Sequence, residues 1–238
     1  MRRNQFLKSV LTLIFSALSF CFLTAQQEQK INLQASAGLD LTTRYVWRGL
    51  VLSPGISAQP YMQLNYSNFS VGAWGSQTLH PFEWMETDFF VSYEWRSLKI
   101  SVWDYFYFDF SSATPHYFNY QKGKTGHVIE TVVEFKGTEK IPVRLLAGYN
   151  FYGNDPAKSV YIETAWMKSL GETNLEIFAG YTPTIGYYHK TKKGLTNVGI
   201  SMARDLLVGN NLSLPLRVSV VYNPMVQQTF LVATIGIR

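Results

Sequence analysis

Apolar and polar residues alternate with a period of two along most of the chain beyond residue 32. In one such segment, Phe89, Val91 and Tyr93 share one phase, whereas Asp88 and Ser92 share the other. A period of 3.6 residues, which marks amphipathic helices, is almost absent from this part of the chain. The pattern therefore predicts an all-β fold in which each strand has one apolar and one polar face.

The alternating segments are about ten residues long, which lets a tilted strand cross a bilayer. The predicted strands are 33–48, 57–66, 69–77, 86–95, 98–108, 127–136, 141–151, 159–168, 175–182, 195–204, 212–223 and 229–238. Only a closed barrel satisfies every strand hydrogen bond in lipid. We therefore predict a closed antiparallel transmembrane β-barrel of about 12 strands, with 10 or 14 as alternatives. In strand 98–108, Asp104 falls on the apolar phase, which predicts a bulge or the membrane edge there.

The connections between the predicted strands differ systematically in length. Those after the second and fourth strands are tight, at Ser67-Asn68 and Arg96-Ser97, and most others after even-numbered strands are of modest length. Those after odd-numbered strands tend to be longer, as at 109–126 and 183–194. Each odd connection contains a proline, which cannot donate a hydrogen bond to a strand ladder. These prolines are Pro54, Pro81, Pro115, Pro156, Pro183 and Pro224. Short turns at one rim and longer loops at the other are typical of outer-membrane barrels.

Aromatic residues of the apolar phase lie near the ends of the predicted strands, as expected for rings at the level of the lipid headgroups. We assign to the long-loop rim Tyr45, Trp47, Tyr149, Phe151, Tyr181 and Tyr222. We assign to the short-turn rim Tyr66, Phe69, Tyr93, Trp95, Phe135 and Trp166. A soluble β-sandwich, which is the alternative fold, also alternates but gives no reason for two aromatic girdles.

The N-terminus has the features of a secretory signal peptide. Basic residues precede an apolar run, 10–23, that is too short to span a bilayer as a helix. We expect cleavage after Ala25, which makes residues 1–25 a signal peptide and residues 26–238 an outer-membrane β-barrel. The only cysteine, Cys21, lies in the removed part, so the mature chain has no disulfide, thiol nucleophile or cysteine zinc ligand.

The composition excludes several classes of protein. Charged residues are 16% of the chain, against about 25% in ordinary soluble domains, and hydrophobic residues are 47%. The formal net charge of +5 includes three basic residues of the signal peptide, Arg2, Arg3 and Lys8. Without them, 18 basic and 16 acidic residues leave a net charge of +2. So small an excess predicts no nucleic-acid partner.

Charged residues of the polar phase are expected to face the barrel lumen, because Arg or Lys at the bilayer midplane costs about 2–4 kcal/mol. The predicted lumen charges are Asp40, Arg44, Arg48, Glu86, Asp88, Glu94, Lys99, Glu130, Glu134, Arg144, Glu163, Glu176 and Arg217. Acids outnumber bases in this set, which predicts a preference for cations. These charged residues either line an aqueous pore or form ion pairs with one another that close the lumen.

Two further features bear on the width of the lumen. The connection 109–126 can fold inward and constrict a pore, or fold outward as a surface loop. The polar-phase aromatics Trp103, Tyr105 and Tyr107 can stack a sugar or nucleoside, or pack inside the barrel rim.

No pattern of residues indicates catalysis, a metal site or a cofactor. The histidines are His80, His116, His127 and His189, and none is followed two residues later by a serine or four residues later by a second histidine. We therefore expect a protein that is not an enzyme and that holds no metal or cofactor.

Three segments resemble a known family. They are the run 43–49 (TRYVWRG), the pair Gln59-Pro60 and the run 69–76 (FSVGAWGS), and the similar region covers about residues 36–95. This succession resembles the TorF-type porins, also called the Gcw_chp family of bacterial outer-membrane proteins. The resemblance implies an outer-membrane barrel with a channel-like function and supplies no catalytic residues. The C-terminus departs from a common pattern of such barrels, since it ends in Arg238 rather than an aromatic residue.

The sequence therefore predicts an exported porin of a Gram-negative outer membrane that lets small solutes or ions diffuse through a charged lumen. Its expected partners are the lipid bilayer, the barrel-assembly machinery and the diffusing solutes; the oligomeric state stays open. One alternative is a sealed barrel that anchors an envelope partner. The other is an outer-membrane lipid-modifying enzyme.

Overall fold

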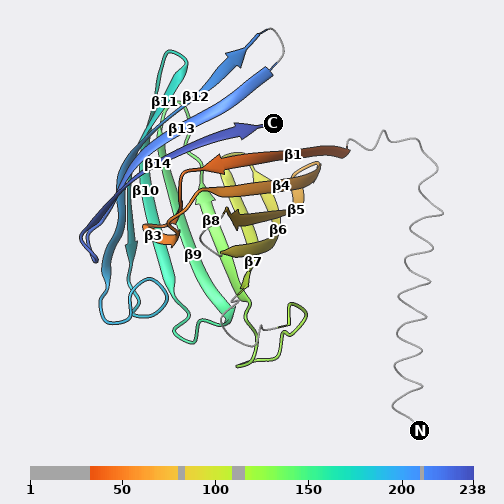
Figure 1. Cartoon of the computed structure of the whole chain (residues 1–238), viewed down its shortest axis with the longest axis vertical. Helices are drawn as coiled ribbons and strands as arrows, with labels where there is room; N and C mark the ends of the chain where they lie inside the picture. Colours follow the sequence, from red (N-terminus) through yellow and green to blue (C-terminus); the bar gives the residue numbers. More distant parts are fainter. Residues whose placement is uncertain (1–32, 80–83, 109–115, 210–211) are drawn as a thin grey trace, which may run out of the picture. The chain divides into compact units, whose positions relative to one another are not determined.

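The computed structural model describes residues 33–79, 84–108, 116–209 and 212–238. These residues form a closed barrel of twelve antiparallel strands and a separate two-stranded sheet (Figure 1). The predicted closed, antiparallel barrel of about 12 strands is thereby confirmed. The predicted signal peptide and the residues His80, Pro81 and Pro115 lie outside the described residues. In the described part of the chain, no helix is long and apolar enough to span a bilayer.

The barrel strands agree closely with the predicted ones. They are β1 (Leu33–Thr42), β4 (Ser57–Tyr66), β5 (Phe69–Thr78), β6 (Met85–Trp95), β7 (Leu98–Phe108), β8 (Val128–Phe135), β9 (Val143–Gly153), β10 (Val160–Leu170), β11 (Thr173–Thr182), β12 (Gly194–Val208), β13 (Leu212–Asn223) and β14 (Gln228–Ile237). The two-stranded sheet consists of β2 (Tyr45–Trp47) and β3 (Leu50–Ser53).

Each barrel strand pairs with its neighbours in chain order, and β14 pairs with β1 to close the barrel. The closing ladder is short: it joins Leu39–Thr42 to Thr234–Ile237 through four residue pairs, whereas the β1–β4 ladder has ten. An ion pair supports this seam, because the Arg238 guanidinium lies 2.5 Å from the Asp40 carboxylate.

The two faces of the barrel wall carry opposite chemistry. Large apolar side chains of the outer face are open to the surroundings, as at Met62, Ile100 and Leu231, which are 63%, 50% and 62% exposed. The inner face buries polar side chains such as Asp88 and Asn150. The distribution of polar and apolar side chains is thus the reverse of that in soluble proteins. It follows from the alternation, because each strand turns its polar phase toward the lumen.

The first predicted strand, 33–48, is wrong at its C-terminal end. Strand β1 stops at Thr42, and β2 and β3 form a hairpin that folds into the barrel interior. Its two-residue turn is Arg48-Gly49, with φ of 51° and 81°, and positive φ at both turn residues is typical of a tight hairpin. Tyr45 and Trp47 are consequently interior residues and not part of the outer aromatic girdle.

The remaining girdle residues lie on the outer face as predicted. Most are about 40–55% exposed, and they lie at or near the strand ends. The difference for Tyr45 and Trp47 has a simple cause. Alternation continues through the connection after β1, although the backbone leaves the barrel wall there.

Asp104 lies on the outer face of β7 without a bulge, since the β6–β7 ladder runs in continuous register past it. The described part of the long connection, 116–127, covers this carboxylate from outside. His127 Nδ1 and the Tyr120 hydroxyl lie 2.7 Å and 2.6 Å from its oxygens. Phe106, on the same face, is fully buried beneath Tyr117. The described residues of this connection therefore pack on the outer face and do not enter the lumen.

Candidate functional site in the barrel lumen

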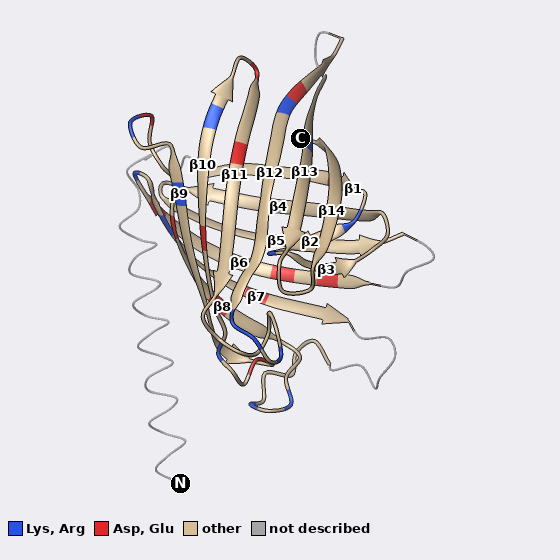
Figure 2. Ribbon diagram, turned by 90° about the vertical axis from the view of Figure 1, so that its left-hand side faces the viewer, with Lys and Arg blue, Asp and Glu red and all other residues tan. Residues whose placement is uncertain are grey.

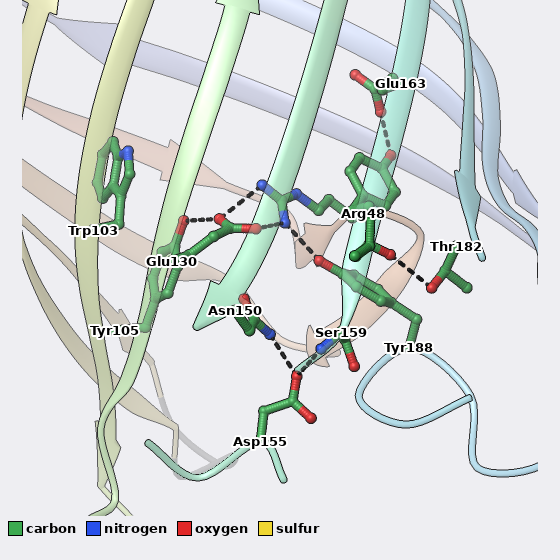
Figure 3. Close-up of polar contacts among 12 residues, drawn as sticks. Arg48, Trp103, Tyr105, Glu130, Asn150, Asp155, Ser159, Glu163, Thr182 and Tyr188 are labelled. Carbon is green, nitrogen blue, oxygen red and sulfur yellow. Dashed lines mark hydrogen bonds and ion pairs between the residues drawn. The ribbon is translucent and has the colours of Figure 1, made fainter. Parts of the chain in front are cut away.

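The tip of the β2–β3 hairpin is attached to the barrel wall by a buried ion pair (Figure 3). The Arg48 guanidinium donates two hydrogen bonds to the Glu130 carboxylate of β8, at 2.6 Å and 2.9 Å. It donates a third, at 2.5 Å, to the hydroxyl of Tyr188 in the β11–β12 connection. Glu130 is fully buried and also accepts a hydrogen bond from Tyr105 at 2.8 Å. The planar guanidinium suits this bidentate contact with a carboxylate.

Aromatic rings enclose the same guanidinium. Its central carbon lies 4.4 Å from the ring centre of Trp47 and 4.6 Å from that of Tyr161, which are favourable cation–π distances. The Trp47 ring stacks on Tyr188 with centroids 5.7 Å apart and meets Tyr105 edge-on at 5.8 Å. The hairpin therefore bridges the lumen from β1 to the walls formed by β7, β8 and β10.

Two glycines leave room for this arrangement. A Cβ at Gly49 would overlap the carbonyl oxygen of Thr196, and its φ of 81° is strained for other residues. A Cβ at Gly148 would overlap the Glu130 carboxylate. The Gly49 carbonyl also accepts a hydrogen bond from the Asn223 amide at 2.9 Å.

A second polar network lies on the wall formed by β8 to β11. Arg144 contacts Glu163 at 2.7 Å and Glu176 at 2.6 Å, and Glu134 lies 3.9 Å away. Glu163 also accepts hydrogen bonds from the Tyr161 hydroxyl and, at 2.7 Å, from the Asn197 amide. One arginine therefore compensates several inward-facing carboxylates.

Two residues that hold the loops around the hairpin were not predicted from the sequence. Asp155, in the β9–β10 connection, accepts hydrogen bonds from the Asn150 amide and the Ser159 backbone, both at 2.8 Å (Figure 3). Tyr188 is buried, and burial raises the pKa of its hydroxyl above the usual value of about 10, so the hydroxyl is neutral. Neither position belongs to an alternating strand, so no periodic signal marks it.

The aromatic residues predicted as a stacking surface all face the lumen, but each already contacts another side chain of the protein. Trp103 stacks on Phe90 with centroids 4.5 Å apart, and Tyr107 stacks on Trp84 at 5.3 Å. Tyr105 is the donor to Glu130 described above. The arrangement corresponds to packing inside the barrel.

The other predicted lumen charges fall into two groups. The acids have partners. Glu86 accepts a hydrogen bond from the Trp84 indole at 3.3 Å, and Asp88 accepts one from the Phe106 backbone at 3.2 Å. Glu94 forms an ion pair with Lys136 at 2.6 Å, and Asp40 forms one with Arg238. The bases Arg44, Lys99 and Arg217 have no ion pair among the residues that the structure describes. Figure 2 shows charged positions both along the barrel strands and in the connections between them.

Two cavities border the hairpin. One, of about 280 Å³, contacts Tyr45, Val46 and Arg48 and extends along the inner faces of β9 to β14. The other, of about 340 Å³, contacts Trp47 and Arg48 and extends along β7 to β10. Both are lined largely by polar or charged side chains. Larger hollows of about 740 Å³ and 610 Å³ lie toward the short-turn end of the barrel.

In the described ranges, no group of three or more histidine, cysteine or acidic side chains is arranged to hold a metal ion. His127 is engaged by Asp104 and by the carbonyl oxygen of Tyr117, and His189 caps backbone amides of its own loop.

Comparison with known proteins adds no family assignment. No protein-family model matches the chain, and a search of curated proteins finds no similar sequence. The resemblance to the TorF-type porins thus stays a prediction, while a β-barrel, the fold that it implied, is present.

Proposed function

We propose that this protein is an outer-membrane, porin-like channel for small solutes or ions, narrowed by the β2–β3 hairpin. The observation that carries the proposal is the structure of the lumen. A hairpin crosses it, is attached mainly by polar contacts, and is bordered by cavities lined with charged and hydroxyl-bearing side chains. Side chains of this kind replace part of the hydration of a passing solute.

The outer face supports a location in a membrane. Apolar side chains cover the strands from outside, and aromatic rings lie near both ends, as at Tyr222 and Trp95. Soluble monomers rarely expose a continuous apolar surface of this extent. The bilayer and the barrel-assembly machinery are therefore the partners that we propose, together with the diffusing solutes.

The segment that narrows the lumen in this proposal is not the connection 109–126 that was considered from the sequence. In this proposal the connection after β1 narrows the lumen, because Arg48 at its tip contacts the opposite wall. The described part of the connection after β7 covers the outer face instead.

Planar-bilayer recording of the refolded protein tests the proposal. Discrete conductance steps are expected, and they should disappear when the protein is heat-unfolded before addition. Protein that is folded by circular dichroism and heat-shifted gel migration, yet adds no conductance, would contradict the channel.

The second candidate function is a sealed barrel that anchors an envelope partner. It is favoured by one observation: the guanidinium of Arg48 has five polar or aromatic contacts, which suits a permanently closed hairpin. Capture of a stable partner by cross-linking in cells, with no conductance from the folded barrel, would favour this function.

We propose no enzymatic activity. Among the described histidines, no imidazole is hydrogen-bonded to a serine or cysteine side chain, which a lipid hydrolase of the histidine–serine type requires. Phospholipid hydrolysis that disappears in a His127→Ala variant would overturn this conclusion.

A further inference from the structure

The smaller cavity beside the hairpin is positively charged. Its lining includes four arginines, Arg44, Arg48, Arg144 and Arg217, and two glutamates, Glu163 and Glu176, which give a net charge of +2. Arg48 is neutralised by Glu130, which lies outside this lining, and even then an excess of one positive charge remains.

Pairing determines which of these charges are available to a ligand. Arg144 is committed to the two glutamates of the lining. Arg44 and Arg217 have no side-chain hydrogen bond or ion pair among the described residues, and the Nε atom of Arg44 is buried without any partner. A buried guanidinium nitrogen without an acceptor is costly, and an anion relieves that cost.

The strand register brings the two free arginines to one region of the wall. Arg217 of β13 is opposite Thr234 of β14, and Thr234 is opposite Thr42 of β1, two residues before Arg44. The hydroxyl of Thr234 donates to that of Thr42 at 3.0 Å. Ser219 and Ser201 also line the cavity, and the Ser219 hydroxyl donates to that of Ser201 at 2.9 Å, so the Ser201 proton is available to a ligand. Two guanidinium groups among hydroxyl donors are the chemistry that binds carboxylates and phosphates.

We propose that this cavity is a binding site for a small anion of the carboxylate or phosphate class. A volume of about 280 Å³ is at the lower end of the range for ligand pockets, so the anion is small. The proposal deepens the proposed channel function, because an anion site in the lumen selects which solutes pass. It reverses the cation preference expected from the sequence, which counted inward acids without their partners.

The test compares wild type with the double variant Arg44→Gln/Arg217→Gln. Lys122→Gln/Lys124→Gln is the matched control, since it removes two positive charges from an exposed loop outside the cavity. Correct folding of each variant is checked by heat-shifted gel migration. Arg44→Lys/Arg217→Lys serves as a second variant that keeps the charge but loses the planar, bidentate donors.

Reversal potentials are measured in a KCl gradient at low ionic strength, where charges are weakly screened. Wild type and the loop control should be anion-selective, and the Gln variant should lose at least about tenfold of the chloride-to-potassium preference. The Lys variant should retain most of it. Conducting wild-type channels without anion selectivity, or a folded Gln variant with unchanged selectivity, would overturn the site while leaving the channel intact.

Binding is measured independently of conductance, by thermal stabilisation of the detergent-solubilised barrel with inorganic phosphate or succinate as the probe. Stabilisation should occur in wild type and the loop control and be lost in the Gln variant. The stronger of the two probes indicates whether a phosphate or a carboxylate is preferred. A barrel stabilised by neither anion would refute the site; a stabilised barrel that never conducts would keep the site and refute the channel.

Discussion

Neutralising the Glu130 carboxylate is the most direct perturbation of the hairpin. Glu130→Gln keeps the size and shape of the side chain but removes the charge that faces Arg48. The Tyr105 hydroxyl, which now donates to Glu130, can still donate to the amide oxygen. Arg48 keeps Tyr188, the two aromatic rings that enclose it and one acceptor, the amide oxygen, in place of two carboxylate oxygens.

The burial of the Arg48–Glu130 pair determines how much free energy of hairpin attachment the Glu130→Gln variant loses. Glu130 is fully buried and the Arg48 side chain is 10% exposed, so water compensates little of the lost interaction. Breaking a buried pair by removing one partner costs about 3–5 kcal/mol. Glutamine retains one acceptor oxygen, so we expect a weakening of hairpin attachment near 3 kcal/mol. Because about 1.4 kcal/mol corresponds to a factor of ten, the ratio of released to attached hairpin should rise roughly a hundredfold.

Single-channel recording reads this ratio as the fraction of time spent in the larger conductance state. Glu130→Gln should raise that fraction strongly over wild type. Glu134→Gln is the matched control, because Glu134 lies on the same strand and face but is 3.9 Å from its arginine. A correctly folded Glu130→Gln channel with the conductance and gating of wild type would refute the idea that this ion pair holds the constriction.

Three further outcomes are expected. Gly49→Ala should displace the hairpin and raise the conductance, because the new methyl group overlaps a backbone carbonyl of β12. Gly123→Ala is the control: its methyl group meets nothing within 4 Å, so the only expected effect is a loss of about 1 kcal/mol of unfolding free energy. His127→Ala should expose the carboxylate of β7 and speed tryptic cleavage of the loop after β7, while the exposed His116→Ala should leave the cleavage rate unchanged. Arg144→Gln leaves two inward carboxylates without their cation and should lower the unfolding free energy by about 3–5 kcal/mol in urea titrations, unlike a substitution of an exposed loop lysine.

The local pattern of the chain determined the barrel wall. Apart from the C-terminal end of the first strand, the barrel strands were predicted to within a few residues, because alternation, tight turns and loop prolines are properties of neighbouring residues. The inward placement of Glu130, Arg144 and Glu163 followed from the same period, since a strand turns alternate side chains to opposite faces.

Only the tertiary structure decided what these inward residues do. Tyr45 and Trp47 continue the alternation of β1, yet the turn at Arg48-Gly49 and contacts with Glu130, far along the chain, draw them into the lumen. Pairing likewise depends on which strands lie opposite one another, so the free charges could not be counted from the sequence. A strand period records which side of the wall a residue faces, whereas the partner that it meets there depends on the closure of the barrel.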